Sequence, residues 1–219
     1  MVAVLISGGA IEEEFAVGFL DKCKADQIIA VDRGLTFCKR YGIRPNCIVG
    51  DFDSLPGGIL EEYEKDTDIM IKRLIPEKDD SDSECAMHLA MDMGAEIIYL
   101  LGGVGTRLDH VMANLQLLAY ARVRGVKMYM ADAHNLITVL DGTTVLKREN
   151  QFGDYVSFFS LGDEVTDVTL RGFRYPLTDY RLTNTSCGLT VSNEIAEEEA
   201  TVSFSEGLLV LSLIHISEP

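Results

Sequence analysis

The stretch Val49-Gly50-Asp51-Phe52-Asp53-Ser54-Leu55 decides how the rest of the chain is interpreted. A short apolar run at residues 47–49 predicts a buried strand, and Gly50 ends it. Asp51 and Asp53 then follow at alternate positions, where an open α/β sheet binds its ligands. Carboxylate oxygens suit Mg²⁺, which prefers hard ligands and retains part of its water shell. Asp and Ser are also ordinary turn residues, so the stretch alone is compatible with a metal site or a plain turn.

On both sides of that stretch, strand-like runs alternate with helical patterns as far as about residue 130. The expected strands are residues 2–6, 27–31, 46–49, 68–71, 96–101 and 126–130. The expected helices are residues 12–24, a short one ending at 42, then 59–65, 85–93 and 109–122. Ser81 and Glu84 have the spacing of a capping box before residues 85–93. This alternation predicts a doubly wound, mostly parallel sheet with helices on both faces.

The pattern changes after Asn135, where short β-like runs replace the alternation. They cover residues 136–140, 155–159, 165–170, 189–191, 201–204 and 208–211. Gly, Asp and Asn separate them, with no helical period between, which predicts an all-β, sandwich-like second domain. We therefore expect an α/β domain over residues 1–136 and a β domain over residues 137–219.

Composition narrows the classes of partner. The formal net charge of −16 would repel DNA or RNA at long range, so a nucleic-acid partner is not expected. No apolar run is long enough to cross a membrane, and residues 1–8 lack the features of a signal peptide. The five cysteines are odd in number and contain no Cys-x-x-Cys pair. This usage favours reduced thiols in the cytoplasm over disulfides or a zinc site.

Glycine-bearing polar turns would converge at the carboxyl edge of the first sheet. They are residues 7–9, 32–34, 50–54 and 102–110, with residues 78–82 before a helix N-terminus that favours anions. Their backbone N–H groups can approach phosphates, and Arg33, Lys78 and Arg107 could neutralise phosphate charge. Neither glycine turn matches a Walker A motif or the full dinucleotide fingerprint, so each alone is also compatible with a simple strand-to-helix connection.

A second acidic group lies at Asp79, Asp80 and Asp82. For Asp80 we favour a solvated helix N-terminus, where the helix dipole stabilises negative charge. If Asp82 lies near Asp51 and Asp53, the three carboxylates repel each other unless a cation lies between them, which is the physical case for Mg²⁺. No Ser-His-Asp order or reactive Cys setting is evident, so we expect positioning and charge neutralisation in place of covalent catalysis.

Several ordered motifs resemble those of the thiamine pyrophosphokinase family, over nearly the whole chain. They are Gly50-Asp51-Phe52-Asp53-Ser54, Lys78-Asp79-x-Ser81-Asp82, Gly102-Gly103-x-Gly105-x-Arg107-x-Asp109-His110, Leu170-Arg171-Gly172-Phe173-Arg174-Tyr175-Pro176-Leu177 and Val191-Ser192-Asn193-Glu194. The resemblance implies transfer of the diphosphate group of ATP to the hydroxyethyl group of thiamine, giving thiamine diphosphate and AMP. It also implies a homodimer that holds thiamine between one subunit's first domain and the other's second.

The resemblance further implies roles for individual residues. Asp51, Asp53 and Asp82 would hold Mg²⁺, with Asp79 as a further catalytic carboxylate. The residues around ATP would be Asp32, Arg33, Gly103, Arg107, Asp109 and His110. The residues that contact thiamine would be Asp82, Tyr175, Ser192 and Asn193. From the residues alone, a structural role is also open for each of the following. His110 is equally compatible with a helix cap. Tyr175 is compatible with a core aromatic, and Ser192 and Asn193 with a plain turn.

The chain also departs from the family pattern. Ser81 stands where Thr is usual, and the chain has no Trp to take the place near Tyr175 that Trp holds in many relatives. Residues 213–219 match nothing in the family. Two other functions remain open: a metal-dependent phosphohydrolase with Asp51 as nucleophile, and a non-catalytic nucleotide or thiamine sensor. The first leaves the glycine–arginine loop unexplained, and the second has little need for three crowded carboxylates.

Overall fold

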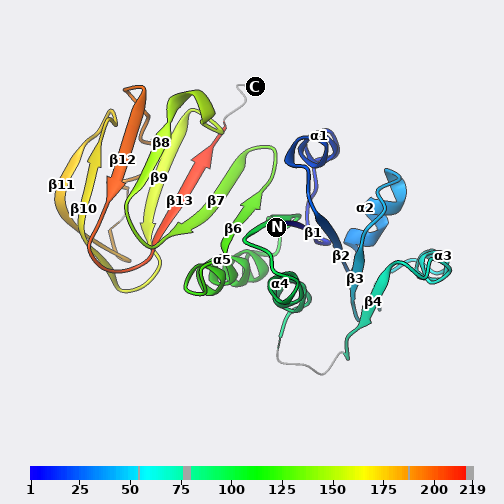
Figure 1. The fold of residues 1–219 in the computed structure, drawn as a ribbon. Coiled ribbons are helices and arrows are strands. Elements are labelled where there is room, and N and C mark those ends of the chain that lie inside the picture. The colour runs from blue at the N-terminus through cyan, green and yellow to red at the C-terminus, as the bar shows by residue number, and fades with distance from the viewer. Residues whose placement is uncertain (54, 76–79, 187, 216–219) are drawn as a thin grey trace. The chain divides into compact units, whose positions relative to one another are not determined.

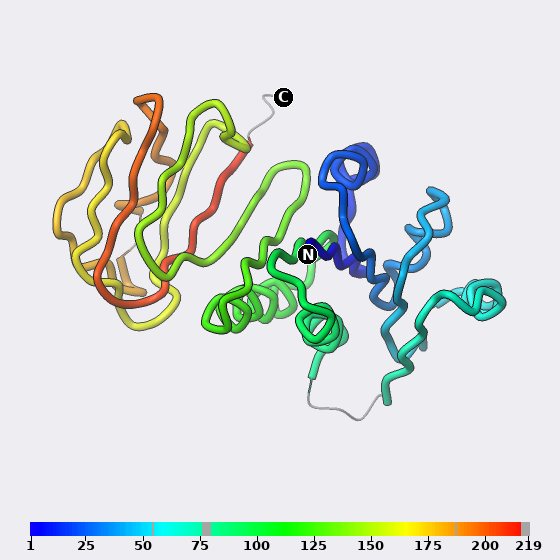
Figure 2. Tube along the Cα trace, in the orientation of Figure 1, coloured from blue at the N-terminus to red at the C-terminus, as the bar shows by residue number. Residues whose placement is uncertain are grey.

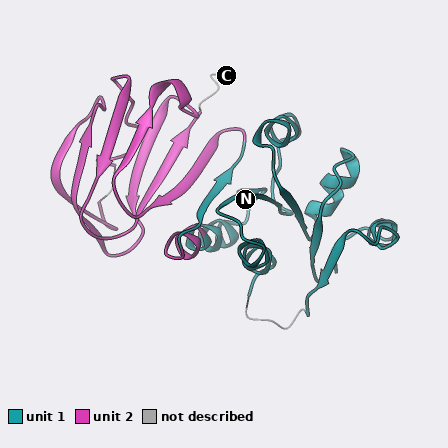
Figure 3. Ribbon diagram, in the orientation of Figure 1, with its two compact units in different colours: residues 1–117, 125–132 teal, residues 118–124, 133–219 magenta. Residues whose placement is uncertain are grey.

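The computed structural model describes residues 1–53, 55–75, 80–186 and 188–215 (Figure 1). The chain divides into two compact units, one of residues 1–117 with 125–132 and one of residues 118–124 with 133–219 (Figure 3). We call them the first unit and the second unit. The first is α/β and the second is almost entirely β, which confirms the predicted fold class.

The first unit contains a parallel sheet with the strand order β4-β3-β2-β1-β5-β6. The strands are β1 (Val2–Ile6), β2 (Gln27–Val31), β3 (Cys47–Gly50), β4 (Met70–Arg73), β5 (Ile97–Leu101) and β6 (Lys127–Ala131). The order reverses at β1, which pairs with β2 on one side and with β5 on the other. Ligands of open α/β sheets bind at such a reversal, at the carboxyl ends of the strands.

Helices connect the strands and cover the sheet. They are α1 (Glu13–Cys23), α2 (Gly34–Arg40), α3 (Ile59–Tyr63), α4 (Asp82–Asp92) and α5 (Leu108–Arg122). Consecutive residues of β1, from Ala3 to Ile6, are fully buried. Because neighbouring side chains of a strand point to opposite faces, both faces of the sheet are covered there. The Ser81 side chain caps α4 by accepting a hydrogen bond from the Glu84 N–H at 3.2 Å, as its spacing predicts.

The second unit is built from an antiparallel sheet with the order β7-β13-β9 and another with the order β11-β10-β12-β8. The elements are β7 (Asn135–Leu140), β8 (Thr144–Lys147), a 3₁₀ turn at Arg148–Asn150, β9 (Tyr155–Ser160), β10 (Glu164–Arg171), β11 (Leu177–Thr183), β12 (Glu199–Ser203) and β13 (Leu209–Ile214). Figure 2 shows the path of these strands, coloured from green to red, as the chain runs up and down. Side chains of both sheets, such as Phe158 and Leu170, share one apolar core. The arrangement is the predicted sandwich.

Three sequence predictions in the second unit are wrong or incomplete. Residues 189–191 form a turn and not a strand. The apolar side chains of Leu189 and Val191 are 50% and 40% exposed, whereas the polar Thr190 between them is buried. In a strand that packs on the core, the apolar side chains would be the buried ones. Strands β8 and β11 were missed because most of their residues are polar or exposed.

In the described part of the chain, no helix is both long and apolar enough to cross a membrane.

Candidate active site

A cavity of about 770 Å³ lies at the carboxyl ends of β1, β2 and β5, where the strand order reverses. Its walls are the loops that follow these strands, together with the first turns of α4 and α5. The predicted site residues on these walls are Asp32, Arg33, Asp82, Gly103, Arg107, Asp109 and His110. A cavity of this size at this position is typical of a small-molecule site in an open α/β sheet.

Glycines allow the loops after β1 and β5 to pack into one wall of the cavity. A Cβ atom on Gly9 would lie 2.1 Å from the carbonyl oxygen of Gly102, so any other residue would push the two loops apart. The Ala10 N–H donates to the Val104 carbonyl at 3.2 Å and thereby joins the loops. Gly102 has φ +71°, a conformation in which glycine pays no steric cost. The loop crossing therefore explains why glycines stand at these positions.

Asn114 braces the loop after β5 from α5. Its side chain is buried, and Nδ2 donates to the Gly103 carbonyl at 2.8 Å. Buried amides nearly always have such a partner, because an unpaired one costs the full desolvation penalty. Sequence reasoning missed Asn114, although a short amide side chain in the interior of this helix was a usable signal.

Asp32 links the ends of β2 and β3. Its Oδ1 accepts a hydrogen bond from the Phe52 N–H at 3.2 Å. The pKa of Asp32 is raised from 3.8 to about 6, mainly by burial and also by the negative charges of Asp82 and Asp51, while the hydrogen bond from the Phe52 N–H lowers it. The electrostatic influence of Asp51 and Asp82 on one carboxyl group places all three acids in one neighbourhood.

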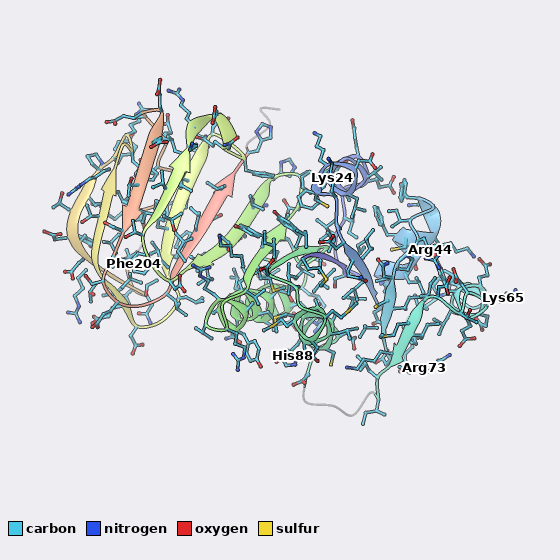
Figure 4. All side chains as sticks on the ribbon, viewed as in Figure 1. Lys24, Arg44, Lys65, Arg73, His88 and Phe204 are labelled. Atoms are coloured by element: carbon cyan, nitrogen blue, oxygen red, sulfur yellow. The ribbon has the colours of Figure 1, made fainter. Side chains whose placement is uncertain are left out.

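The loop that carries Asp51 and Asp53 has a strained backbone. Phe52 between them has φ +66°, which is rare for a bulky residue. The Asp53 N–H donates to Asp51 Oδ1 at 3.1 Å, which closes the turn. Figure 4 labels Arg73 at the end of β4. Its guanidinium lies 5.5 Å from the centre of the Phe52 ring. Strain of this kind persists only where surrounding contacts enforce it, and it is common at functional sites.

The predicted trio of metal ligands is only partly assembled. Among the described residues, no three His, Cys, Asp or Glu side chains form a group that could hold a metal ion. Asp51 and Asp82 are half-buried near Asp32, whereas Asp53 is exposed. Asp79 and Lys78 lie outside the described residues.

Arg107 supplies the main ion pair of the cavity wall. Its Nη2 lies 2.5 Å from Asp109 Oδ2, and its Nε donates to Asp109 Oδ1 at 3.3 Å. The guanidinium hydrogen bond holds the pKa of Asp109 below its usual value. Both side chains are exposed, and the His110 N–H donates to the Arg107 carbonyl at 3.1 Å in the first turn of α5. Arg107 thus faces the cavity with a carboxylate of its own loop as partner.

A smaller cavity of about 270 Å³ adjoins the same edge of the sheet. It shares the turn of residues 7–9 and Arg33 with the larger cavity, and Phe37 and Arg40 of α2 also line it. Arg33 is exposed between the two and belongs to the walls of both.

The remaining predicted site residues lie together in the second unit. Tyr175 is 54% exposed, so it is not a core aromatic. Asn193 is buried, and its side chain forms hydrogen bonds with the backbone N–H and carbonyl of Tyr175 at 3.0 and 2.8 Å. Ser192, next to it, is exposed and has φ +56°. The structure therefore brings these three residues to one place in the fold.

The fold and the cavity define a class of protein: a doubly wound α/β unit with a polar, glycine-walled ligand site, joined in sequence to a β-sandwich. Comparison with known proteins is more specific. The model of the thiamin pyrophosphokinase catalytic domain matches residues 22–130, and that of the thiamin pyrophosphokinase vitamin B1 binding domain matches residues 143–209. The thiamine pyrophosphokinase of Bacillus subtilis (strain 168) is 31% identical over 183 residues, which is 84% of this chain and 85% of that protein. The chain belongs to the thiamine pyrophosphokinase family.

Solved structures agree with this assignment. The crystal structure of thiamine pyrophosphokinase from Bacillus subtilis has a TM-score of 0.87 at 27% identity, over 99% of this chain and 100% of that one. The thiamin pyrophosphokinase of Geobacillus thermodenitrificans has a TM-score of 0.83 at 31% identity, over 100% and 99% of the two chains. The activity that follows is that of the family, an enzymatic transfer of the diphosphate group from ATP to thiamine.

Proposed function

We propose that this transfer takes place at the large cavity of the first unit and yields thiamine diphosphate and AMP. The observation that carries the proposal is the meeting of Arg33 and Arg107 with Asp32 and Asp82 around one glycine-walled cavity. Cations that bind phosphate and carboxylates that can work with a metal ion are the groups that phosphoryl-type transfer needs.

The phosphates of ATP would lie along the loops after β1 and β5. The first turns of α4 and α5 line the cavity, and the free N–H groups at a helix N-terminus attract anions. Arg107 would exchange Asp109 for a phosphate, because an exposed ion pair contributes little and is easily replaced. Around the nucleotide we place Asp32, Arg33, Gly103, Arg107, Asp109 and His110.

Magnesium would be held by Asp51, Asp53 and Asp82, with Asp79 as a further acidic member. Burial is the largest cause of the raised pKa of Asp32, and the charges of Asp82 and Asp51 add to it; a divalent ion would relieve this added repulsion, which supports a cation here. Mg²⁺ commonly takes only one or two carboxylates and completes its shell with phosphate oxygens and water, so a complete protein cage is not required. When bound, the ion would neutralise phosphate charge and polarise the reacting phosphoryl group.

The chain's own residues would then position the reactants. The hydroxyl of thiamine must face the β-phosphorus of ATP in line with the bond to the departing AMP. Asp82 or Asp79 would orient this hydroxyl and accept its proton, and Arg33 and Arg107 would stabilise the negative charge that develops on AMP.

Thiamine would be bound by the β-rich part of the chain. We assign residues 1–136 to a catalytic domain for ATP and Mg²⁺ and residues 137–219 to a thiamine-binding domain. The match of residues 143–209 to a vitamin B1 binding domain supports this, because that range contains Tyr175, Ser192 and Asn193. The ring of Tyr175 is exposed and suits the cationic rings of thiamine.

We further propose a homodimer in the cytoplasm, in which thiamine lies between the first domain of one subunit and the second domain of its partner. Free thiols at Cys23, Cys38 and Cys47 support a reducing compartment. Sedimentation at several protein concentrations tests the dimer, and a monomeric active species would refute it.

The decisive experiment is a product assay with ATP, Mg²⁺ and thiamine. We expect AMP and thiamine diphosphate in equal amounts, both dependent on the metal and on thiamine. ADP or inorganic phosphate as the product would contradict the proposed reaction. A phosphorylated Asp51 would indicate a phosphohydrolase, and tight binding without turnover would indicate a sensor.

A further inference from the structure

The segment of residues 190–193 is not a strand, but its backbone is hydrogen-bonded to the edge strand β9 at two points. The Phe158 N–H donates to the Thr190 carbonyl at 3.0 Å. Three residues further along, Val156 and Asn193 exchange both backbone hydrogen bonds, at 2.8 and 2.9 Å. Between these two points the segment bulges outward, because Ser192 adopts φ +56°.

Buried hydroxyl groups replace the ladder bonds that the bulge interrupts. Ser157 of β9 accepts the Ser192 N–H on its Oγ at 3.0 Å. Thr190 donates its hydroxyl to the Phe158 carbonyl. Ser157 and Thr190 are both buried, so these bonds are shielded from water. The backbone on both sides of Ser192 is therefore fixed to β9, while the Ser192 side chain is exposed.

Asn193 extends this support to the segment that carries Tyr175. Phe173 pairs with Ile195, and the Arg174 N–H donates to the Glu194 carbonyl at 2.9 Å. At Tyr175 the pairing passes from backbone to side chain: Asn193 Oδ1 accepts the Tyr175 N–H, and Asn193 Nδ2 donates to the Tyr175 carbonyl. An amide side chain can do both, because it carries a donor and an acceptor.

The Asn193 side chain is committed to these contacts. It is part of a residue only 2% exposed, and its oxygen also accepts the Glu194 N–H at 2.9 Å. A carbonyl-type oxygen has two lone pairs, and both have a partner here. The oxygen could contact a ligand only by releasing Tyr175 or Glu194, and the burial of the residue keeps the second Nδ2 hydrogen away from a ligand at the surface.

The Tyr175 ring is left exposed by this arrangement but is flanked by charge. The guanidinium of Arg174 lies 5.6 Å from the centre of the ring, and Arg174 Nη1 pairs with Glu194 Oε1 at 2.6 Å. Since Asn193 bonds to the backbone of both Tyr175 and Glu194, it fixes the ring and the acidic partner of Arg174 together.

We propose that Asn193 is a positioning residue for Tyr175 and not a substrate contact. The support formed by Asn193, Ser157 and Thr190 holds the Tyr175 ring and the Ser192 hydroxyl ready for the cationic rings of thiamine. This inference rests on the proposed function for the substrate, but the role of Asn193 as a brace does not. It replaces the direct thiamine contact that the family resemblance implies for Asn193.

The test begins with Asn193→Asp, which keeps the size and the acceptors but places a carboxylate oxygen against the Tyr175 carbonyl. Losing this donor should raise the KM for thiamine on the order of tenfold, since an unpaired buried group costs about that much in binding when the site loosens. The kcat and the KM for ATP should change less than about twofold, because those contacts lie elsewhere. Should Asn193→Asp fail to fold, Asn193→Ser removes the same bridge with a smaller disturbance.

A double-mutant cycle with Tyr175→Ala distinguishes positioning from contact. If Asn193 acts only through Tyr175, the double variant binds thiamine no more weakly than Tyr175→Ala alone. If the losses of thiamine affinity in the two single variants multiply in the double variant, Asn193 has its own contact with thiamine and the inference is overturned.

Hydrogen exchange at the Tyr175 amide tests the brace without any substrate. We expect exchange on the order of tenfold faster in Asn193→Asp, because the new carboxylate oxygen repels the Tyr175 carbonyl and the remaining acceptor then holds the Tyr175 N–H less firmly. Thr169→Val is the matched control: Thr169 is buried in the same unit and its Oγ1 accepts the Asp179 N–H at 3.1 Å, so its loss should loosen Asp179 and leave Tyr175 and the KM for thiamine unchanged. Unchanged exchange at Tyr175 in Asn193→Asp overturns the inference. Faster exchange with an unchanged KM for thiamine confirms the brace and refutes the role of Tyr175 in the proposed function.

Discussion

The cavity of the first unit and the segment around Ser192 in the second unit hold their candidate ligand contacts by opposite means. In the first unit, the carboxylate of Asp32 holds the Phe52 backbone while the charges of Asp51 and Asp82 oppose its ionisation. In the second unit, neutral buried groups of Ser157 and Asn193 hold the backbone of Ser192 and Tyr175. The first arrangement depends on pH, whereas the second does not. On the proposed function, a site for a metal–phosphate complex and a surface for an aromatic cation would therefore place different demands on the chain.

The largest effect expected from breaking the first arrangement is that of Asp51→Asn. If Asp51 holds the metal ion at the reacting phosphates, as proposed, loss of its charge should lower kcat on the order of a hundredfold or more, because it removes charge stabilisation that acts in the transition state. The measurement is AMP release at saturating ATP and thiamine over a range of Mg²⁺ concentrations. Asp21→Asn, at an exposed position of α1, is the matched charge control. Equal rates for both variants would remove Asp51 from the site.

Gly9→Ala tests whether the cavity wall needs the close crossing of its two loops. The added methyl group would meet the Gly102 carbonyl at 2.1 Å, so one loop must move. We expect a loss of unfolding free energy of about 2–3 kcal/mol and a raised KM for ATP, as for other overpacked sites. Gly18→Ala in α1 is the control, because open space surrounds it and helix propensity favours Ala there by roughly 0.5–1 kcal/mol. If both variants are equally stable, the close contact between the loops after β1 and β5 does not constrain the cavity wall.

The neutral arrangement of the second unit is tested by Ser157→Ala. This change leaves the Ser192 N–H without its buried acceptor and should cost about 1 kcal/mol of unfolding free energy. The cost should be the same at pH 5 and pH 8, since the groups involved do not titrate there. Denaturant unfolding at both pH values measures this cost. A clear pH dependence would contradict the statement that the arrangement in the second unit is independent of pH.

Asp32→Asn should show the opposite behaviour. The folded protein holds the Asp32 proton more tightly than the unfolded chain, since the pKa is about 6 against 3.8, so this group's contribution to stability falls as the pH rises through that range. Asn keeps an acceptor for the Phe52 N–H but removes the charge. At pH 7 the variant should be more stable by about 1 kcal/mol, after allowance for solvent screening of a half-exposed group, and the gain should vanish near pH 4. A variant that is less stable at pH 7 would show that the Asp32 charge supports the fold.

The sequence predicted the first unit well because its signals are local. Strand β1 is a continuous apolar run, which is what a parallel strand buried on both faces requires. Once the strands alternate with helices, topology alone brings the loops with Arg33 and Arg107 to one edge of the sheet. The family resemblance supplied the reaction and the substrates, which the pattern of residues could not have named.

Other features depend on contacts between residues far apart in the chain, so the sequence did not reveal them. Ser157 and Ser192 are 35 positions apart, and nothing near Ser157 indicates that its hydroxyl serves a turn. Strand β11 was missed because its polar residues face solvent. The role of Asn193 was misassigned, on our inference, because a motif identifies a residue but not the atoms that it contacts.

The pair of Arg107 and Asp109 has a consequence for which anions the cavity can retain. The two residues are only two positions apart, so the arginine always has a counter-ion within reach. A small monovalent anion gains little by competing with it, because the exchange replaces one single charge with another. Only a polyanion that binds several groups at once gains enough free energy to offset the loss of the ion pair between Arg107 and Asp109. We therefore expect chloride or acetate to be poor competitors of the nucleotide, whereas inorganic diphosphate should inhibit.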